Sequence, residues 1–252
     1  MKPVVGIAYW RDGGNPVKRT VIDRTEQWAS VDLLDPETEH ADMQTRAYDL
    51  YHMAKRRRGS LFNLERASAA GIPTVNPPGS AWLSSDRFMR SKLLEDNEFP
   101  VPAYEYGTAD QISLGPPVVV KPRWEWSQDA HDFETISARP VEFDGRKLVE
   151  RYVPHDRVLK AYGIGDRVRF VEGPDRPRET VPPSSVRNLF ARVQSVLDLT
   201  VFEVDIAITG DDCCVFDVNP VVSLAGVEGG ARMYEAELRA RCGTDVPSLP
   251  SA

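Results

Sequence analysis

The sequence predicts a mixed α/β (α+β) fold with three lobes: a small N-terminal α/β lobe over residues 1–79, a central α+β lobe over 80–154 and a C-terminal α+β lobe over 155–252. Three observations support this prediction. Short β-branched runs alternate with segments whose apolar residues recur at helical spacing. Proline and glycine interrupt the chain near Gly79, where the first lobe boundary falls. A length of 252 residues is enough for one large domain or two to three small lobes.

The N-terminal lobe is predicted to begin with a buried strand, because Val4 to Trp10 is a short apolar run. From Ala41 to Arg58 the apolar residues recur at helical spacing, so we expect an amphipathic helix there. A further helix is expected from Leu61 to Ala70, followed by a short strand that ends at Pro77-Pro78.

Two features of this lobe are compatible with anion binding, but ordinary structural roles explain both. Gly13-Gly14 follows the first strand without any phosphate-binding motif, so we interpret the pair as a plain turn. Lys55 to Arg58 closes the expected helix over residues 41–58. Because cations at a helix C-terminus complement the helix dipole, we interpret this basic run as a helix ending.

The central lobe is predicted to combine a helix with strands. Ser84 or Ser85 can cap a helix that must end before Pro100. The β-branched runs Val118 to Lys121 and Leu148 to Val153 are typical of strands.

The C-terminal lobe is predicted to contain a hairpin followed by a helix. Val158 to Ile164 and Val168 to Val171 flank a glycine-containing turn, which indicates the hairpin. The apolar residues from Val186 to Leu197 then repeat at helical spacing, with Ser184 or Ser185 as the expected cap.

The most informative segment is a second hairpin signature, from Val201 to Asn219. Alternation along its strands puts apolar residues on one face and polar residues on the other. The apolar set is Phe202, Val204, Ile206, Ile208, Phe216 and Val218, and the polar set is Glu203, Asp205, Asp217 and Asn219. If Gly210 to Asp212 is a three-residue loop, Asp205 lies directly opposite Asp217.

Two carboxylates that face each other destabilise a sheet unless water or a cation screens them. One interpretation is that Asp205, Asp217 and Asn219 bind Mg²⁺, which prefers hard oxygen ligands and completes its shell with water and phosphate oxygens. Such a site would indicate a nucleotide. The alternative is that these residues simply face solvent on a half-exposed hairpin, and the hairpin alone leaves both interpretations open.

The composition of the chain excludes several classes of protein. A net charge of −7 argues against a protein that mainly binds nucleic acid or an anionic membrane. No apolar stretch approaches the length of a membrane span, and the N-terminus reads as a strand, so we expect a cytoplasmic protein. The 3 cysteines, two of them adjacent, indicate reduced thiols without metal-ligand spacing.

Eight short motifs, taken in order over nearly the whole chain, resemble the ATP-grasp superfamily. They are Gly71-Ile72-Pro73 with Asn76-Pro77, Ser85-Asp86-Arg87, Phe99-Pro100-Val101-Pro102, Val118 to Pro122, Val149 to Val153, Lys160 to Asp166, Glu203 to Ile206, and Asp217 to Pro220. The likeness is strongest to RimK-like carboxylate–amine ligases and to inositol polyphosphate kinases. It implies an ATP-grasp fold whose two α+β lobes sandwich the nucleotide.

The resemblance also implies catalytic roles. Arg87 and Lys121 occupy positions where the family places cations on the nucleotide phosphates, with Lys92 as a rival to Arg87. Lys160 matches a basic residue that the family directs at the γ-phosphate or at an acyl-phosphate intermediate.

Further matches concern the nucleotide and the metal. Glu150 and the backbone of Arg151, Tyr152 and Val153 match the hinge segment that contacts adenine. Asp205, Asp217 and Asn219 match the Mg²⁺ ligands, so the resemblance and the opposed carboxylates indicate the same residues.

One segment departs from the family pattern. Most members carry a glycine-rich loop after the lysine, whereas this chain has Arg123 to Asp129 with Trp124, Trp126 and no glycine. Either the two tryptophans close over the nucleotide, or they pack structurally and the enzyme is slow or inactive.

The resemblance implies an enzyme that uses ATP and Mg²⁺. We expect a ligase that joins a small-molecule carboxylate to an amine, such as an amino acid or a peptide, through an acyl phosphate. An ATP-grasp kinase acting on a polyol such as an inositol phosphate is the first alternative, and a degenerate nucleotide-binding module is the second. No nucleic-acid or membrane partner is expected, and the sequence is compatible with a homodimer.

Overall fold

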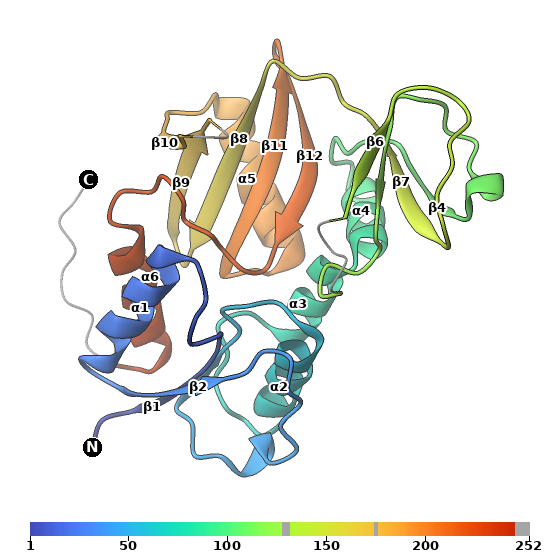
Figure 1. Cartoon of the computed structure of the whole chain (residues 1–252). Helices are drawn as coiled ribbons and strands as arrows, with labels where there is room; N and C mark the ends of the chain where they lie inside the picture. Colours follow the sequence, from blue (N-terminus) through green and yellow to red (C-terminus); the bar gives the residue numbers. More distant parts are fainter. Residues whose placement is uncertain (128–131, 174–175, 245–252) are drawn as a thin grey trace.

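The computed structural model describes residues 1–127, 132–173 and 176–244, and the strands in these ranges form three sheets (Figure 1). A three-stranded parallel sheet comes from the N-terminal part of the chain. A four-stranded antiparallel sheet follows, and a five-stranded antiparallel sheet comes from the C-terminal part. The mixed α+β class predicted from the sequence is confirmed.

The parallel sheet has the order β2-β1-β3, with β1 in its centre. Its strands are β1 (Val4–Ala8), β2 (Ser30–Leu34) and β3 (Leu50–His52). The connecting elements are α1 (Pro16–Glu26), the 3-10 helix η1 (Met43–Thr45) and, after β3, helix α2 (Arg58–Ala69). The first strand and the helix over residues 61–70 confirm the sequence predictions.

The helix predicted from Ala41 to Arg58 is wrong. Its centre is strand β3, which pairs in parallel with β1 and is buried along its whole length. A strand buried on both faces has no polar alternation, so its apolar residues can imitate helical spacing. The basic run at residues 55–58 therefore lies between a strand and the start of α2, not at the end of a helix.

The four-stranded sheet has the order β4-β7-β5-β6. Its strands are β4 (Tyr104–Gly107), β5 (Val118–Lys121), β6 (Glu134–Ile136) and β7 (Lys147–Arg151), with the 3-10 helix η2 (Ala109–Gln111) after β4. Helices α3 (Pro78–Ser85) and α4 (Arg87–Asp96) precede it. The predicted serine cap is wrong, because Ser84 and Ser85 end α3. Asp86 caps α4 by accepting hydrogen bonds from the backbone N–H groups of Phe88 and Met89.

The five-stranded sheet has the order β10-β9-β8-β11-β12. Its strands are β8 (Arg157–Ile164), β9 (Arg167–Glu172), β10 (Arg178–Glu179), β11 (Val201–Thr209) and β12 (Asp212–Asn219). Helix α5 (Ser184–Leu197) packs its apolar residues against one face of this sheet (Figure 1). The helix is as predicted, but Pro183 precedes it and Ser184 is its first residue, so neither serine is the cap.

The hairpin formed by β11 and β12 has the predicted strands but a different turn. Thr209 pairs with Asp212, so the loop has two residues, and Gly210 adopts φ +57° in it. A bulge at Phe216 then shifts the register by one residue, and Asp205 faces Asp217 as predicted. Because of the bulge, Val215 joins Val218 in the core, whereas Phe216, which was expected on that face, is excluded from it.

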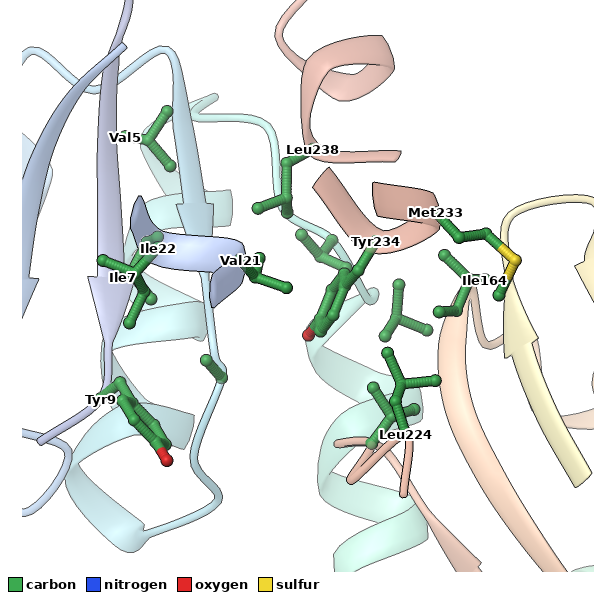
Figure 2. Close-up of a cluster of buried hydrophobic side chains, with 14 of the residues drawn as sticks. Val5, Ile7, Tyr9, Val21, Ile22, Ile164, Leu224, Met233, Tyr234 and Leu238 are labelled. Atoms are coloured by element: carbon green, nitrogen blue, oxygen red, sulfur yellow. The ribbon is translucent and has the colours of Figure 1, made fainter. Parts of the chain in front are cut away.

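The parallel sheet is held against the five-stranded sheet by a shared hydrophobic core. Helix α6 (Gly230–Arg241) packs beside α1 and contributes Met233, Tyr234 and Leu238 to this core (Figure 2). Val5 and Ile7 of β1 and Ile164 of β8 belong to the same cluster. This packing fixes the loops that follow β1 and β3 relative to strands β8, β11 and β12. In the ranges that the structure describes, no helix has the length and apolar character needed to cross a bilayer.

Candidate active site

A cavity of about 360 Å³ lies between the four-stranded and the five-stranded sheets, and we call it the inter-sheet cavity. Strands β5, β7, β11 and β12 and the segment after β7 supply most of its walls. The residues that line it include Val119, Lys121, Glu150, Arg151, Tyr152, Val153, Asp205, Ala207, Phe216 and Asp217. The structure thus gathers most of the residues predicted for nucleotide and metal binding around one space.

Alternation along β5 explains why this cavity is apolar on one side and charged at its end. Val118 and Val120 point into the core of the small sheet, so Val119 and Lys121 point the other way and line the cavity. The lysine that closes the valine run is therefore a cavity residue. Its ammonium lies 2.5 Å from Glu150 Oε2, and both side chains are largely buried.

The predicted hinge, Arg151 to Val153, lines the cavity, but two of its backbone N–H groups are already used. Arg151 donates to the carbonyl of Ala103 at 2.8 Å, and Tyr152 donates to that of Pro117 at 3.0 Å. Among the described residues, the N–H of Val153 has no such partner. The Val153 carbonyl lies 2.9 Å from Nδ1 of His155, so among the described residues the Val153 N–H and the carbonyls of Arg151 and Tyr152 are the groups left for a ligand.

Asp205 and Asp217 close the end of the inter-sheet cavity. Burial, with the nearby Asp217 and Glu203 adding to it against Lys160, raises the pKa of Asp205 to about 7. Burial also opposes ionisation of Asp217, but Arg90, Arg87 and Lys121 outweigh it and hold the pKa of Asp217 well below its ordinary value. The opposed pair therefore has one carboxylate firmly ionised and one that is not.

Lys160, on the neighbouring strand β8, lies between two carboxylates. Its ammonium is 2.8 Å from Asp205 Oδ1 and 3.1 Å from Glu203 Oε1. Burial by itself lowers the pKa of Lys160, but Glu203 and Asp205 outweigh it and raise the pKa above its ordinary value. Lys160 is therefore a permanently charged cation beside the acidic pair.

Arg87 is less free than the sequence suggested. It lines the cavity, but its guanidinium donates to the carbonyl of Pro122 at 2.7 Å, and its Nε lies 3.1 Å from Glu125 Oε1. Lys92, its rival, pairs with Asp96 at 3.2 Å on the exposed side of α4 and lines none of the cavities described here.

Glu125 is a buried carboxylate at the centre of an ion-pair network, and it was not predicted from the sequence. Its carboxylate forms ion pairs with Arg56, Arg87 and Arg90, all of which are buried. Arg90 in turn lies 2.7 Å from Asp217 Oδ1. An acidic residue inside the segment 123–127 was the only sequence signal for this network, since its three arginines come from two distant parts of the chain.

The two tryptophans beside Glu125 pack structurally in the described part of this loop. Trp126 packs against the core cluster of the N-terminal lobe, and the Arg123 guanidinium lies 4.7 Å from the ring of Trp124. Neither ring lines the inter-sheet cavity. These contacts favour structural packing of the two rings over closure on the nucleotide. Its last predicted residues, Gln128 and Asp129, lie outside the described residues.

The predicted metal ligands fit a hard cation in part. Asp205 Oδ1 and Asp217 Oδ1 are buried and accept no hydrogen bond from the described residues, although each lies within ion-pair distance of a cation. Buried carboxylate oxygens of this kind suit Mg²⁺. Asn219 fits less well, because its Oδ1 accepts a 2.7 Å hydrogen bond from Arg56. In the described ranges, no group of three or more His, Cys, Asp or Glu side chains is arranged to hold a metal.

A second cavity, of about 450 Å³, adjoins the first and shares Arg87, Asp205 and Asp217 with it; we call it the N-lobe cavity. The loops after β1 and β3 supply one wall, and β8, β11 and β12 supply another. Its basic residues are Lys18, Lys55, Arg56, Arg57, Arg87 and Lys160. The interpretation of Gly13-Gly14 and the basic run as purely local features is corrected, since both segments line this cavity.

Comparison with known proteins gives no match to a family model and none to a curated protein. Solved structures do match. The crystal structure of a RimK domain protein ATP-grasp from Sphaerobacter thermophilus has a TM-score of 0.77 at 17% identity, over 92% of this chain and 97% of that one.

Two further structures match at similar coverage. D-alanine–D-alanine ligase from Bacillus anthracis has a TM-score of 0.71 at 12% identity, over 97% of each chain. The ATP-grasp ligase PsnB, complexed with precursor peptide PsnA2 and AMPPNP, has a TM-score of 0.69 at 13% identity, over 96% of this chain and 97% of that one. Together with the three sheets described above, these likenesses show that the chain has the ATP-grasp fold.

Proposed function

We propose that this protein is an ATP-dependent carboxylate–amine ligase that forms an amide or peptide bond through an acyl phosphate and releases ADP and phosphate. One observation carries the proposal: an apolar cavity suited to a base meets a cationic cavity at Asp205 and Asp217. A nucleotide placed across this junction would present its terminal phosphate to a second substrate. The ligases among the structurally similar proteins support this class of reaction.

In this proposal the inter-sheet cavity holds the nucleoside. Val119, Ala207 and Phe216 supply apolar walls for the base. The Val153 N–H and the carbonyls of Arg151 and Tyr152 read its edge, since the N–H groups of Arg151 and Tyr152 and the carbonyl of Val153 are already engaged. Glu150, paired with Lys121, is placed to contact the amino group or the ribose.

The phosphates would then extend toward the cations at the junction. Lys121, Lys160 and Arg87 come from three different elements, and each lines at least one of the two cavities. Fixed positive charges of this kind stabilise the charge that spreads over a transferred phosphoryl group. Mg²⁺, when bound by Asp205 and Asp217 with Asn219 as the weaker candidate, would neutralise phosphate charge and orient the phosphates.

The reaction needs no covalent nucleophile from the protein. The substrate carboxylate attacks the γ-phosphorus, the bond to the β-phosphate oxygen breaks, and ADP leaves. The amine then attacks the acyl carbon, loses a proton to solvent or base, and phosphate leaves. Walls that exclude water would protect the acyl phosphate from hydrolysis. Because the reaction consumes ATP, we place the protein in the cytoplasm. PsnB was solved with a precursor peptide, which supports an amino acid or a peptide as a substrate.

Two other functions would use the same cavities. A kinase would transfer the phosphoryl group to a hydroxyl, and the cationic N-lobe cavity is compatible with a phosphorylated polyol. Two of the similar structures named above are ligases by name, however, and none is named as a kinase. A degenerate module would bind the nucleotide without turnover. The retained Lys121, Lys160, Asp205 and Asp217 weigh against that reading.

The deciding experiment measures free phosphate and ADP produced from Mg-ATP when the purified protein receives a fractionated cell extract. We expect a ratio near one after subtraction of the substrate-free rate. ADP without matching free phosphate would mean that a product keeps the phosphoryl group, and would replace the ligase by a kinase. Absence of ADP with every fraction, in a protein that binds Mg-ATP, would favour the degenerate module.

A further inference from the structure

The N-lobe cavity lies where a parallel sheet presents its ligand-binding edge. Strand β1 is central, and the chain runs from it first to β2 on one side and then to β3 on the other. In open α/β sheets, ligands bind outside the carboxyl ends of the strands at such a reversal of direction. The loops that follow β1 and β3, at residues 9–15 and 53–57, contribute most of the N-terminal wall of the cavity.

Among the residues that the structure describes, two lysines in this wall have no ion-pair partner. Lys18, only 8% exposed, donates a 2.5 Å hydrogen bond to the carbonyl of Ala54. The ammonium of Lys55 lies 5.2 Å from the ring centroid of Trp10. Within the described ranges neither lysine has a carboxylate within 4.0 Å, whereas Arg56 and Lys160 of the same cavity are committed to buried carboxylates.

Lys18 is buried and Lys55 is half-buried, and in the described ranges neither has an ion-pair partner, so their charges are costly unless a ligand neutralises them. Burial lowers the pKa of Lys18 to about 8, and it lowers that of Lys55 with help from Arg57 and Arg56. An anion bound between these two side chains would remove this penalty. The aromatic rings of Tyr9 and Trp10 hold the two ammonium groups near the cavity through cation–π contacts.

We infer that the carboxylate substrate carries a second acidic group, and that Lys18 and Lys55 bind it in the N-lobe cavity. This inference rests on the proposed function, because it places the reacting carboxylate at the Lys160 end of the same cavity. The substrate class is thus a small dicarboxylate or a phosphorylated carboxylate. Both kinds of substrate carry a second anionic group at a fixed distance from the reacting carboxylate.

The two lysines are distinct from the cations assigned to the nucleotide. They come from α1 and from the loop after β3, and neither lines the inter-sheet cavity. Lys121, in contrast, lines that cavity from β5. A change at Lys55 is therefore expected to alter the choice of carboxylate while leaving the nucleotide site intact.

The test is calorimetric titration of the protein saturated with Mg-AMPPNP, which does not turn over. The probes are the dicarboxylates from malonate to adipate, each compared with the monocarboxylate of equal length, and 3-phosphoglycerate compared with glycerate. The variants are Lys55→Gln and, as a matched control on the exposed side of α4, Lys92→Gln.

We expect at least one doubly acidic probe to bind about tenfold more tightly than its singly acidic match. That preference is expected to shrink to less than about threefold in K55Q and to persist in K92Q. A better dicarboxylate identifies the second group as a carboxylate, and a better 3-phosphoglycerate identifies it as a phosphate. A preference absent across the panel, or one that survives in K55Q, would overturn the inference while leaving the ligase proposal standing. Failure to bind Mg-AMPPNP would instead overturn both.

Discussion

At the scale of single residues, Asp205 is expected to destabilise the fold, although the proposed function needs its carboxylate. It is largely buried and faces Asp217 across the hairpin. Its pKa is raised to about 7 by burial, with Asp217 and Glu203 adding to the shift against Lys160. A side chain chosen for stability alone would be neutral here. The conflict is resolved if the two carboxylates hold a cation with the phosphates of a nucleotide.

The substitution Asp205→Asn is therefore expected to lower turnover without lowering the free energy of unfolding. Turnover should fall by about 100-fold or more, because a charge at the phosphates is lost. The free energy of unfolding should stay constant or rise by up to about 1 kcal/mol, because a like-charge contact is removed and Lys160 keeps Glu203. Steady-state kinetics and urea unfolding measure both, with Asp211→Asn in the exposed turn as the control. Unchanged turnover would refute the assignment of Asp205.

Lys18 gives a prediction about pH. Its pKa is about 8 in the folded chain against 10.5 ordinarily, because burial, together with Lys55 and Arg56, outweighs the attraction of Glu203. Between pH 8 and 10.5 the unfolded chain binds more protons, so folding becomes more favourable as the pH rises through this window. The wild type should gain about 3 kcal/mol relative to Lys18→Met over that range.

Urea unfolding of the two proteins at several pH values measures this difference, since all other groups titrate alike in both. A constant difference in unfolding free energy from pH 8 to 10.5 would show that the ammonium of Lys18 is not destabilised by burial.

At the scale of elements, strand β12 shows how a bulge divides adjacent side chains between core and cavity. Val215 and Val218 belong to the core under α5, while Phe216 between them lines both the inter-sheet cavity and a neighbouring one. Without the extra residue, a regular strand could not direct both Phe216 and Asp217 toward the inter-sheet cavity.

Two substitutions in β12 should have opposite effects. Val218→Ala is expected to lower the free energy of unfolding by about 2 kcal/mol, because Val218 is fully buried, with little change in nucleotide affinity. Phe216→Ala is expected to weaken Mg-ATP binding about tenfold, because an aromatic wall for the base is lost. Its effect on stability should be small. Thermal unfolding and calorimetry compare the two, and the reverse pattern would contradict the placement of the bulge.

The elements that the sequence predicted correctly are those with a strong local pattern. The amphipathic spacing of residues 186–197 and the alternation of residues 201–208 each identified their element. Strand β3 was mistaken for a helix because a strand buried on both faces carries no alternation. The facing of Asp205 and Asp217 was predicted from a loop one residue too long, and the bulge at Phe216 compensated for the error.

At the scale of the whole molecule, the site depends on contacts between lobes that no local pattern reveals. Lys121, Lys160 and the opposed aspartates could be found from the sequence because each sits in a short motif. Arg56 and Lys18 could not, since α6 and the shared core bring their part of the chain against the five-stranded sheet. Arg90 could not, since its partners Glu125 and Asp217 come from distant segments of the sequence. The basic run at residues 55–58 carried the signal for Lys55, Arg56 and Arg57, which line the N-lobe cavity, but it was assigned to a helix end.

The proposed ligase function requires that the nucleotide bind between the two antiparallel sheets. Val119 tests this directly, because it is half-buried and points into the inter-sheet cavity, away from the core formed by Val118 and Val120. A tryptophan at this position would occupy the space assigned to the base without disturbing that core. Val181, which is 80% exposed, provides the control position for the same substitution.

Calorimetric titration with Mg-ATP of the wild type, Val119→Trp and Val181→Trp is the decisive measurement. We expect one nucleotide per chain for the wild type and for V181W, and an affinity at least about tenfold weaker for V119W, with all three proteins equally folded by circular dichroism. Equal affinity in V119W, or no binding by the wild type, would contradict the assignment of the inter-sheet cavity as the nucleotide site.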